Sequence, residues 1–298
     1  FPPTWPLLAG QYLGPTGPLP AGTRILAFQD NDANFDHTDF NIDLSWHFQN
    51  GNLAYLTYST GYKSGGFDQR FVGPTADGTP STFDPETLAN LEFGLKGSNL
   101  AGRLRWNLAV FSASYDDLQI IVRESFNPLT VNAGKARING AELEADWRID
   151  ENWTARFAGA WLRTKYDELS DAAQASGVKL DNDLVNAPEW STSIGIIYTH
   201  ELSAGGTLSP RLDWSWQASQ FNDAINSPQI RQDSYQLLNL SLAWDLPGEH
   251  WQILGGVRNV LDETILITGN SAFNTSAAYV EQVYARPREW QLSLRYAF

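Results

Sequence analysis

Apolar and polar residues alternate one by one along most of the chain. Segment 40–48 is typical, with Phe40, Ile42 and Leu44 separated by Asn41 and Asp43. The same period of two recurs in segments 91–96, 103–110, 141–149, 208–216, 238–246 and 290–298. Successive side chains of a strand point to opposite faces, so each segment has one apolar and one polar face. No useful length shows helical periodicity, and the pattern predicts an all-β, antiparallel protein.

The alternating segments predict about eleven long strands, at 38–48, 52–62, 87–97, 103–122, 131–149, 152–166, 187–200, 207–221, 232–246, 250–264 and 284–298. A possible twelfth strand runs over 23–29. These segments exceed the five or six residues usual in globular strands. They reach the 9–11 residues with which a tilted strand crosses a bilayer.

The connections between these strands alternate in length. The short ones fall at 49–51, 97–102, 150–151, 201–206 and 247–249, and the longer ones at 63–86, 123–130, 167–186, 222–231 and 265–283. Short turns at one end and longer loops at the other are typical of outer-membrane barrels. The pattern therefore favours a transmembrane β-barrel over a soluble sandwich or propeller.

Tryptophan positions point to the same architecture. Of the 12 Trp residues, a group lies beside the short turns and is expected to form a membrane girdle: Trp46, Trp147, Trp153, Trp244 and Trp251. Others lie toward the long loops, among them Trp161 and Trp190. Two aromatic belts about one bilayer apart are the interfacial girdles of a membrane barrel. The apolar faces between them are nearly free of charge, as contact with lipid requires.

Charge and composition exclude several classes of function. Lys and Arg number 20 against 34 Asp and Glu, a net charge of −14 that argues against a nucleic-acid partner. Cys is absent, and none of the four His stands at metal-ligand spacing from another, so we expect neither a metal site nor a cofactor. The charged residues of the polar face are expected to line a hydrated lumen: Glu142, Glu144, Asp146, Arg103, Arg105, Arg148 and Arg156.

From about residue 38 to 298 the chain resembles the C-terminal part of the β-barrel of TonB-dependent outer-membrane receptors. The resemblance is carried by YKSGGF at 62–67, NAGKARINGAELE at 132–144, VRNVLDE at 257–263 and RPR at 286–288. The closing run LSLRYAF, with Tyr296 and Phe298, looks like the signal read by the barrel-assembly machinery. The sequence pattern of residues 62–66 is most similar to that of receptors for iron complexes.

This resemblance implies a 22-stranded barrel in the outer membrane of a Gram-negative bacterium, surrounded by lipid and plugged by an N-terminal domain. Residues 1–37 would then be a loop and possible strand from mid-barrel, and residues 38–298 the C-terminal barrel strands. The plug and the TonB box are not in this chain, so contact with the TonB complex is expected only through a part outside it. The implied function is TonB-dependent uptake of a ferric chelate (siderophore) or similar scarce nutrient, with no catalytic residue.

A ligand-binding cluster is predicted just beyond one strand, on the long-loop side. It consists of Tyr62, Lys63, Phe67, Arg70 and Phe71. Aromatic and cationic side chains together can hold an anionic aromatic ligand through cation–π and charge-assisted contacts. The structural alternative is a loop that packs on itself.

Two other functions remain open from the residues alone. A self-contained barrel of about twelve strands would act as a passive pore or an adhesin. An outer-membrane barrel hydrolase would need a nucleophile and a base, and Ser45, His47 and Asp43 share one strand face. No Gly-x-Ser-x-Gly elbow supports the hydrolase, and a hydrogen-bonding role for His47 in the lumen is favoured.

Overall fold

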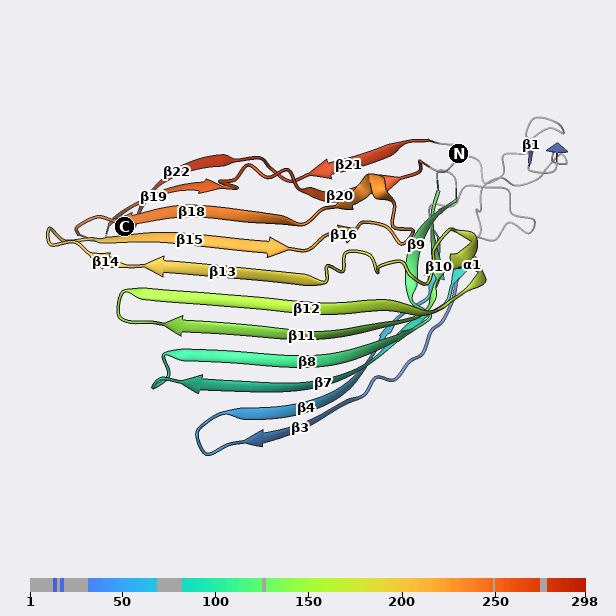
Figure 1. Cartoon of the computed structure of the whole chain (residues 1–298), viewed down its shortest axis with the longest axis horizontal. Coiled ribbons are helices and arrows are strands. Elements are labelled where there is room, and N and C mark those ends of the chain that lie inside the picture. The colour runs from blue at the N-terminus through green and yellow to red at the C-terminus, as the bar shows by residue number, and fades with distance from the viewer. Residues whose placement is uncertain are drawn as a thin grey trace.

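A computed structural model describes residues 13–14, 17–18, 32–68, 82–124, 127–248, 250–273 and 278–298. One long antiparallel sheet dominates it (Figure 1). Its strands in chain order are β3 (Asn41–His47), β4 (Leu53–Lys63), β7 (Glu86–Asn99), β8 (Leu104–Asp116), β11 (Gly134–Arg148), β12 (Trp153–Leu169), β13 (Trp190–Tyr198), β15 (Thr207–Gln217), β18 (Tyr235–Asp245), β19 (Trp251–Arg258) and β22 (Glu289–Tyr296). The short β14 (His200–Glu201) pairs with β15 at its end.

The eleven long strands pair with their neighbours in chain order, up and down from β3 to β22. The predicted number of long strands and the antiparallel class are confirmed. Within the described ranges β3 pairs only with β4 and β22 only with β19, so the curved sheet has two edges. The possible strand at 23–29 and most of segment 1–37 lie outside the described residues; of that segment, the pair β1 (Leu13–Gly14) and β2 (Gly17–Pro18) is described.

The two ends of the sheet differ, as the connection lengths predict. Tight turns join β3 to β4, β7 to β8, β11 to β12 and β18 to β19, all at the left in Figure 1. Small hairpins and helices lie in the longer connections at the other end: β5 (Gly66–Phe67) with β6 (Thr82–Phe83), β9 (Gln119–Glu124) with β10 (Asn127–Asn132), α1 (Asp171–Ala175), β16 (Gln220–Phe221) with β17 (Arg231–Gln232), η1 (Pro228–Ile230), and β20 (Leu266–Ser271) with β21 (Val280–Tyr284).

The prediction of one continuous strand at 103–122 is wrong, because the segment divides into β8 and β9. β8 ends at Asp116, because Asp117 takes a left-handed backbone conformation with φ 56° and breaks the ladder. The alternation then resumes in β9, which pairs with β10 in a hairpin of its own. The segment 123–130, expected to be a loop, contributes the end of β9 and the beginning of β10. The predicted strand 131–149 likewise divides between Asn132, which ends β10, and Gly134, which begins β11 with a φ of 113° that suits glycine alone.

The described helices are short. α1 begins after Ser170, whose hydroxyl accepts a hydrogen bond from the Ala173 amide at 3.2 Å. No helix of the described residues is long and apolar enough to span a membrane.

The two faces of the sheet differ in chemistry. One, the apolar face, carries exposed side chains such as Leu56, Phe93 and Leu143. The opposite, polar face carries Glu142 and Glu144, the neighbours of Leu143 in β11. Cross-strand registers keep the faces continuous, with Leu143 between Leu108 of β8 and Gly159 of β12. Hydrogen bonds and ion pairs connect the polar face: Tyr55 with Glu92 at 2.7 Å, Asp146 with Arg156 at 3.1 Å and Arg211 with Asp213 at 2.7 Å.

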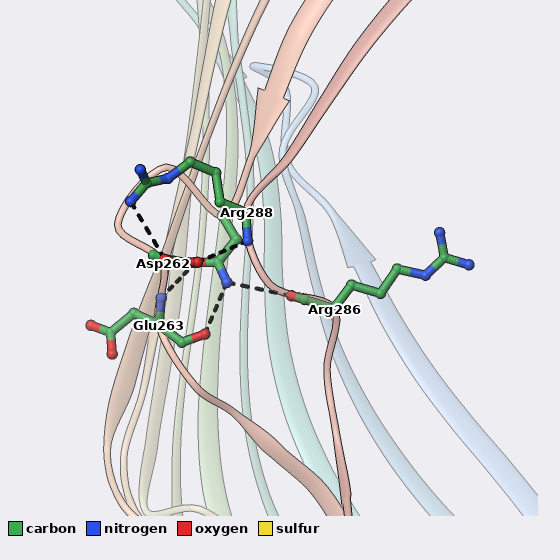
Figure 2. A network of polar contacts seen from close by, with 5 residues as sticks. Asp262, Glu263, Arg286 and Arg288 are labelled. Atoms are coloured by element: carbon green, nitrogen blue, oxygen red, sulfur yellow. Dashed lines mark hydrogen bonds and ion pairs between the residues drawn. The ribbon is translucent and has the colours of Figure 1, made fainter.

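A buried asparagine ties the end of β19 to the segment before β22. Asn259 is only 4% exposed and has a left-handed φ of 50°. The side-chain Nδ2 of Asn259 donates hydrogen bonds to the carbonyls of Glu263 at 2.9 Å and Arg286 at 3.4 Å. The side-chain Oδ1 accepts one from the backbone amide of Glu263 at 2.9 Å. Figure 2 shows this network, in which the Arg288 amide also donates to Asp262 at 3.0 Å.

Candidate functional site

The loops at the long-connection end form the main buried core of the described residues. The β9–β10 hairpin, α1 and the loop residues before β13 and before β17 meet there. The buried members are Ile120, Val122, Ala133, Ala136, Tyr166, Ala173, Val178, Leu184 and Ala224. The sheet itself contributes little to this core, because its strands place apolar side chains on an exposed face. The loops therefore support one another over the end of the sheet.

A cavity of about 490 Å³ opens among these loops. Its apolar walls come from β9, from Leu184 and Val185, and from Ala224, Ile225 and Ile230. Polar side chains complete it: Gln119, Tyr166, Asn222, Asp223, Asn270 and Ser271. An apolar pocket with a few convergent polar groups is the usual form of a small-molecule site.

Three buried oxygen atoms at this cavity have no hydrogen-bond partner among the described residues. They are the Tyr166 hydroxyl and the Oδ1 atoms of Asn222 and Asn270. The two amide nitrogens are engaged, with Asn222 Nδ2 donating to the Ile230 carbonyl at 2.7 Å and Asn270 Nδ2 to Glu281 at 3.1 Å. Buried polar atoms are normally paired, so these oxygens are available to a ligand or to water. Both amide oxygens can only accept, which favours a ligand with N–H or O–H groups.

The described residues that line the cavity carry either no net charge or a negative one. Asp223 is its one carboxylate among the described lining residues, and it also accepts a hydrogen bond from the Ser227 amide at 2.8 Å. No Lys or Arg is found among those described lining residues. This wall suits an uncharged or cationic ligand better than a strongly anionic one.

The structure describes three of the five residues of the predicted ligand cluster, and two of these three point to opposite faces of a strand. Tyr62 and Lys63 are neighbours in β4 and so point to opposite faces. Tyr62 stacks on His37, with ring centroids 4.5 Å apart and an interplanar angle of 9°. Phe67 lies in the β5–β6 hairpin, and Arg70 and Phe71 lie outside the described residues. A ligand role for this cluster stays a prediction.

Most of the predicted lumen residues share the polar face. Asp146 lies between Arg105 and Arg156 in register, and its carboxylate pairs with Arg156. Glu142, Glu144 and Arg148 follow on the same face of β11. Arg103 differs, because it lies in the turn before β8 and its guanidinium donates to the Ile149 carbonyl at 3.2 Å.

The predicted girdle residues lie on the apolar face near the tight turns. Trp46, Trp147, Trp153, Trp244 and Trp251 are all exposed. Trp153 packs on Tyr198 at 4.6 Å between ring centroids, and Trp251 packs on Tyr296 at 4.7 Å. Tyr296 in turn meets Phe298 edge to face at 5.1 Å, so the proposed assembly residues continue this aromatic row.

Sequence reasoning missed the cavity residues. The sequence predicts a barrel strand for Ile120 and Val122, because their alternation continues that of β8 without a visible break. The apolar pairs Leu184-Val185 and Ala224-Ile225, inside otherwise polar loops, are the signal that indicates a loop core. Within the described ranges no group of three or more His, Asp or Glu could hold a metal ion.

Comparison with known proteins identifies one family. A family model described as "TonB dependent receptor-like, beta-barrel" matches residues 14–260. The pesticin receptor of Yersinia pestis is 28% identical over 230 residues, which cover 76% of this chain and 32% of the receptor. The ferric-pyoverdine BN7/BN8 receptor of Pseudomonas putida is 25% identical over 229 residues, or 74% of this chain and 24% of the receptor.

Solved structures show the same fold. The ferric yersiniabactin uptake receptor FyuA from Yersinia pestis superimposes with a TM-score of 0.71 and 23% identity, over 87% of this chain and 37% of that one. The copper transporter OprC superimposes with a TM-score of 0.62 and 17% identity, over 87% and 39% of the two chains. The chain thus spans about a quarter to two fifths of the length of these proteins.

Proposed function

Because the chain belongs to the family of TonB-dependent receptor β-barrels, we propose that it forms the later strands of a receptor that takes up a ferric chelate. Members of this family are transport receptors in the outer membrane of Gram-negative bacteria. The relatives named for pesticin, yersiniabactin and pyoverdine point toward siderophores as the substrate class.

The apolar face of the sheet would contact lipid in this receptor, and the polar face would line the lumen. The tight turns then lie on the periplasmic side and the long loops outside, where they can meet a ligand. Among the described residues β3 and β22 each have one unpaired edge, which fits a barrel that further strands complete, because lipid offers backbone groups no hydrogen-bond partner. Coupling to the TonB complex would run through a part of the receptor outside this chain.

The cavity among the outer loops is the observation that carries the proposal. It lies at the end where a ligand arrives from outside, and its unpartnered oxygens are ready to accept hydrogen bonds. Its apolar wall can cover the ring or chain of a chelate. The absence of Lys and Arg from its described lining favours a chelate with little or no negative charge.

Growth under iron limitation tests the proposal. A Gram-negative host without its own siderophore receptors would express the receptor that contains this chain, with iron supplied as a panel of ferric chelates. The panel would include uncharged hydroxamates, phenolate chelates and trianionic catecholates. We expect growth on at least one chelate of low charge. Growth on none of them, with the receptor present in the outer membrane, would contradict uptake of a ferric chelate.

Filling the cavity should impair binding of that chelate. Val185 lines the cavity and is 37% exposed, so a tryptophan at this position can extend into the space without disturbing the buried core. We expect Val185→Trp to raise the Kd for the accepted chelate at least about tenfold, a loss of about 1.4 kcal/mol. Quenching of tryptophan fluorescence in the purified receptor measures this Kd. Leu180→Trp is the control, because Leu180 is an exposed residue of the same loop that does not line the cavity. Equal affinities of the two variants would place the ligand elsewhere.

A further inference from the structure

Basic residues are distributed unequally between the two faces of the sheet. Most Lys and Arg of the described strands lie on the polar face, as Arg105, Arg156 and Arg211 do. The apolar face carries four, and all of them belong to two neighbouring strands. They are Lys135 and Arg137 in β11 and Arg163 and Lys165 in β12. In a chain with a net charge of −14, this concentration of positive charge on one patch favours binding of an anionic partner.

The four cations lie just beyond one aromatic belt. Trp161 of β12 pairs with Trp190 of β13 on the apolar face, with ring centroids 6.3 Å apart. Arg163 follows two residues further toward the long loops, beside Asn139 of β11. From Trp153 to Trp161 β12 spans nine residues, the length with which a tilted strand crosses the hydrocarbon. Arg163 therefore lies where headgroups begin, and not among acyl chains, where an arginine costs about 2–4 kcal/mol.

The acidic residues of this region do not neutralise it. Asp167 pairs with both Arg137, at 3.1 Å, and Lys165, so one carboxylate serves two cations. Lys135 pairs with Asp116 at 3.6 Å and Glu168 at 3.8 Å. The Arg163 side chain is exposed and makes no ion pair or hydrogen bond within the described part of the chain. Arg137 and Lys165 remain about half exposed despite their pairing.

We propose that Arg137, Arg163 and Lys165 form a binding site on the outside of the barrel for the phosphorylated headgroup of an outer-leaflet lipid. Phosphate oxygens accept charge-assisted hydrogen bonds from guanidinium and ammonium groups, and the Asn139 amide adds a donor. The acyl chains of the same lipid lie along the apolar face below, past Trp161. The site is separate from the loop cavity and does not depend on which chelate the receptor takes up.

Binding of lipid A of defined phosphorylation tests this site. The receptor that contains this chain would be purified in detergent, stripped of lipid, and titrated with bisphosphorylated lipid A and with its dephosphorylated form. Native mass spectrometry measures the bound fraction. We expect Arg163→Gln/Lys165→Gln to weaken binding of the phosphorylated form about 30-fold, since each cation near an anionic surface contributes about 1 kcal/mol. Binding of the dephosphorylated form should be unchanged.

Arg105→Gln/Arg148→Gln is the matched control, because it removes two positive charges from the opposite, polar face of neighbouring strands. It should bind both lipids like the unaltered receptor. Equal binding of the two lipids by the unaltered receptor would overturn the proposal, since only apolar contacts would then be at work. Displacement of the lipid by millimolar inorganic phosphate would also overturn it, by showing a site for a free anion.

Discussion

Replacing Leu143 by arginine is expected to lower the free energy of unfolding of the receptor by about 2–4 kcal/mol. Leu143 is 40% exposed on the apolar face and lies between Leu108 and Gly159 on the neighbouring strands. Leu143 is four positions from Trp147 toward the tight turns and four positions from Asn139 toward the loops, so it lies well inside the apolar band. A guanidinium there meets acyl chains, and the residues opposite it on the described neighbouring strands, Leu108 and Gly159, carry no charge. Urea-induced unfolding in phospholipid vesicles, followed by tryptophan fluorescence, measures the loss.

Ser193→Arg provides the control for this substitution. Ser193 is exposed on the polar face of β13, opposite Ala158, and lines a space shared with Glu144 and Asp213. The same added charge is hydrated at this position and close to carboxylates, so its effect should stay within about 0.5 kcal/mol. An equal loss of stability at both positions would show that the apolar face does not meet lipid. The comparison therefore tests the orientation of the whole sheet.

The faces of the sheet were predictable because strand geometry leaves little choice. Each step along β11 turns the side chain over, so Glu142, Leu143 and Glu144 were assigned to faces as soon as the strand was recognised. The register with β8 and β12 then follows from matching apolar rows and tight turns. The girdle residues were found for the same reason, since their place depends only on strand and turn positions.

The loops were not predictable in this way. The alternation of β8 continues into β9 with no change of period, and the ladder of β8 ends where Asp117 takes a left-handed backbone angle that no composition signals. The same local reasoning grouped Tyr62 with Lys63 because they are adjacent, although adjacency in a strand sends them to opposite faces. Sequence reasoning therefore favours a ligand cluster made of residues close together in the chain over one made of residues that only the fold brings together.

The cavity shows why sequence spacing alone could not locate the site. Tyr166 comes from the end of β12, and Leu184, Asn222 and Asn270 come from three different connections, so many residues separate them along the chain. Their proximity results from strand order and from the way the loops pack over the end of the sheet. No single segment carries the pattern of an apolar wall with acceptor oxygens. Only the assembled loops show it.

The second large effect is expected at Asn259, where Asn259→Ala should destabilise the receptor by about 3–5 kcal/mol. The substitution leaves the Glu263 amide and the carbonyls of Glu263 and Arg286 without their partner, at a cost of about 1–3 kcal/mol for each group that stays buried. Alanine also strains the left-handed backbone, by about 1–2 kcal/mol. These contacts join β19 to the chain that enters the final strand (Figure 2), so the edge formed by β22 should loosen first.

Two further variants separate the causes of this loss. Asn259→Gly removes the same hydrogen bonds but tolerates the positive φ, so it should be about 1 kcal/mol more stable than Asn259→Ala. Asn152→Ala removes one exposed hydrogen bond, from Asn152 Nδ2 to the Thr199 carbonyl at 2.7 Å, and should cost about 1 kcal/mol or less. Unfolding in urea measures all three, and hydrogen exchange of the β22 amides reports the edge directly. If Asn259→Ala lost no more stability than Asn152→Ala and left β22 protected, the final strand would be held by its ladder to β19 alone.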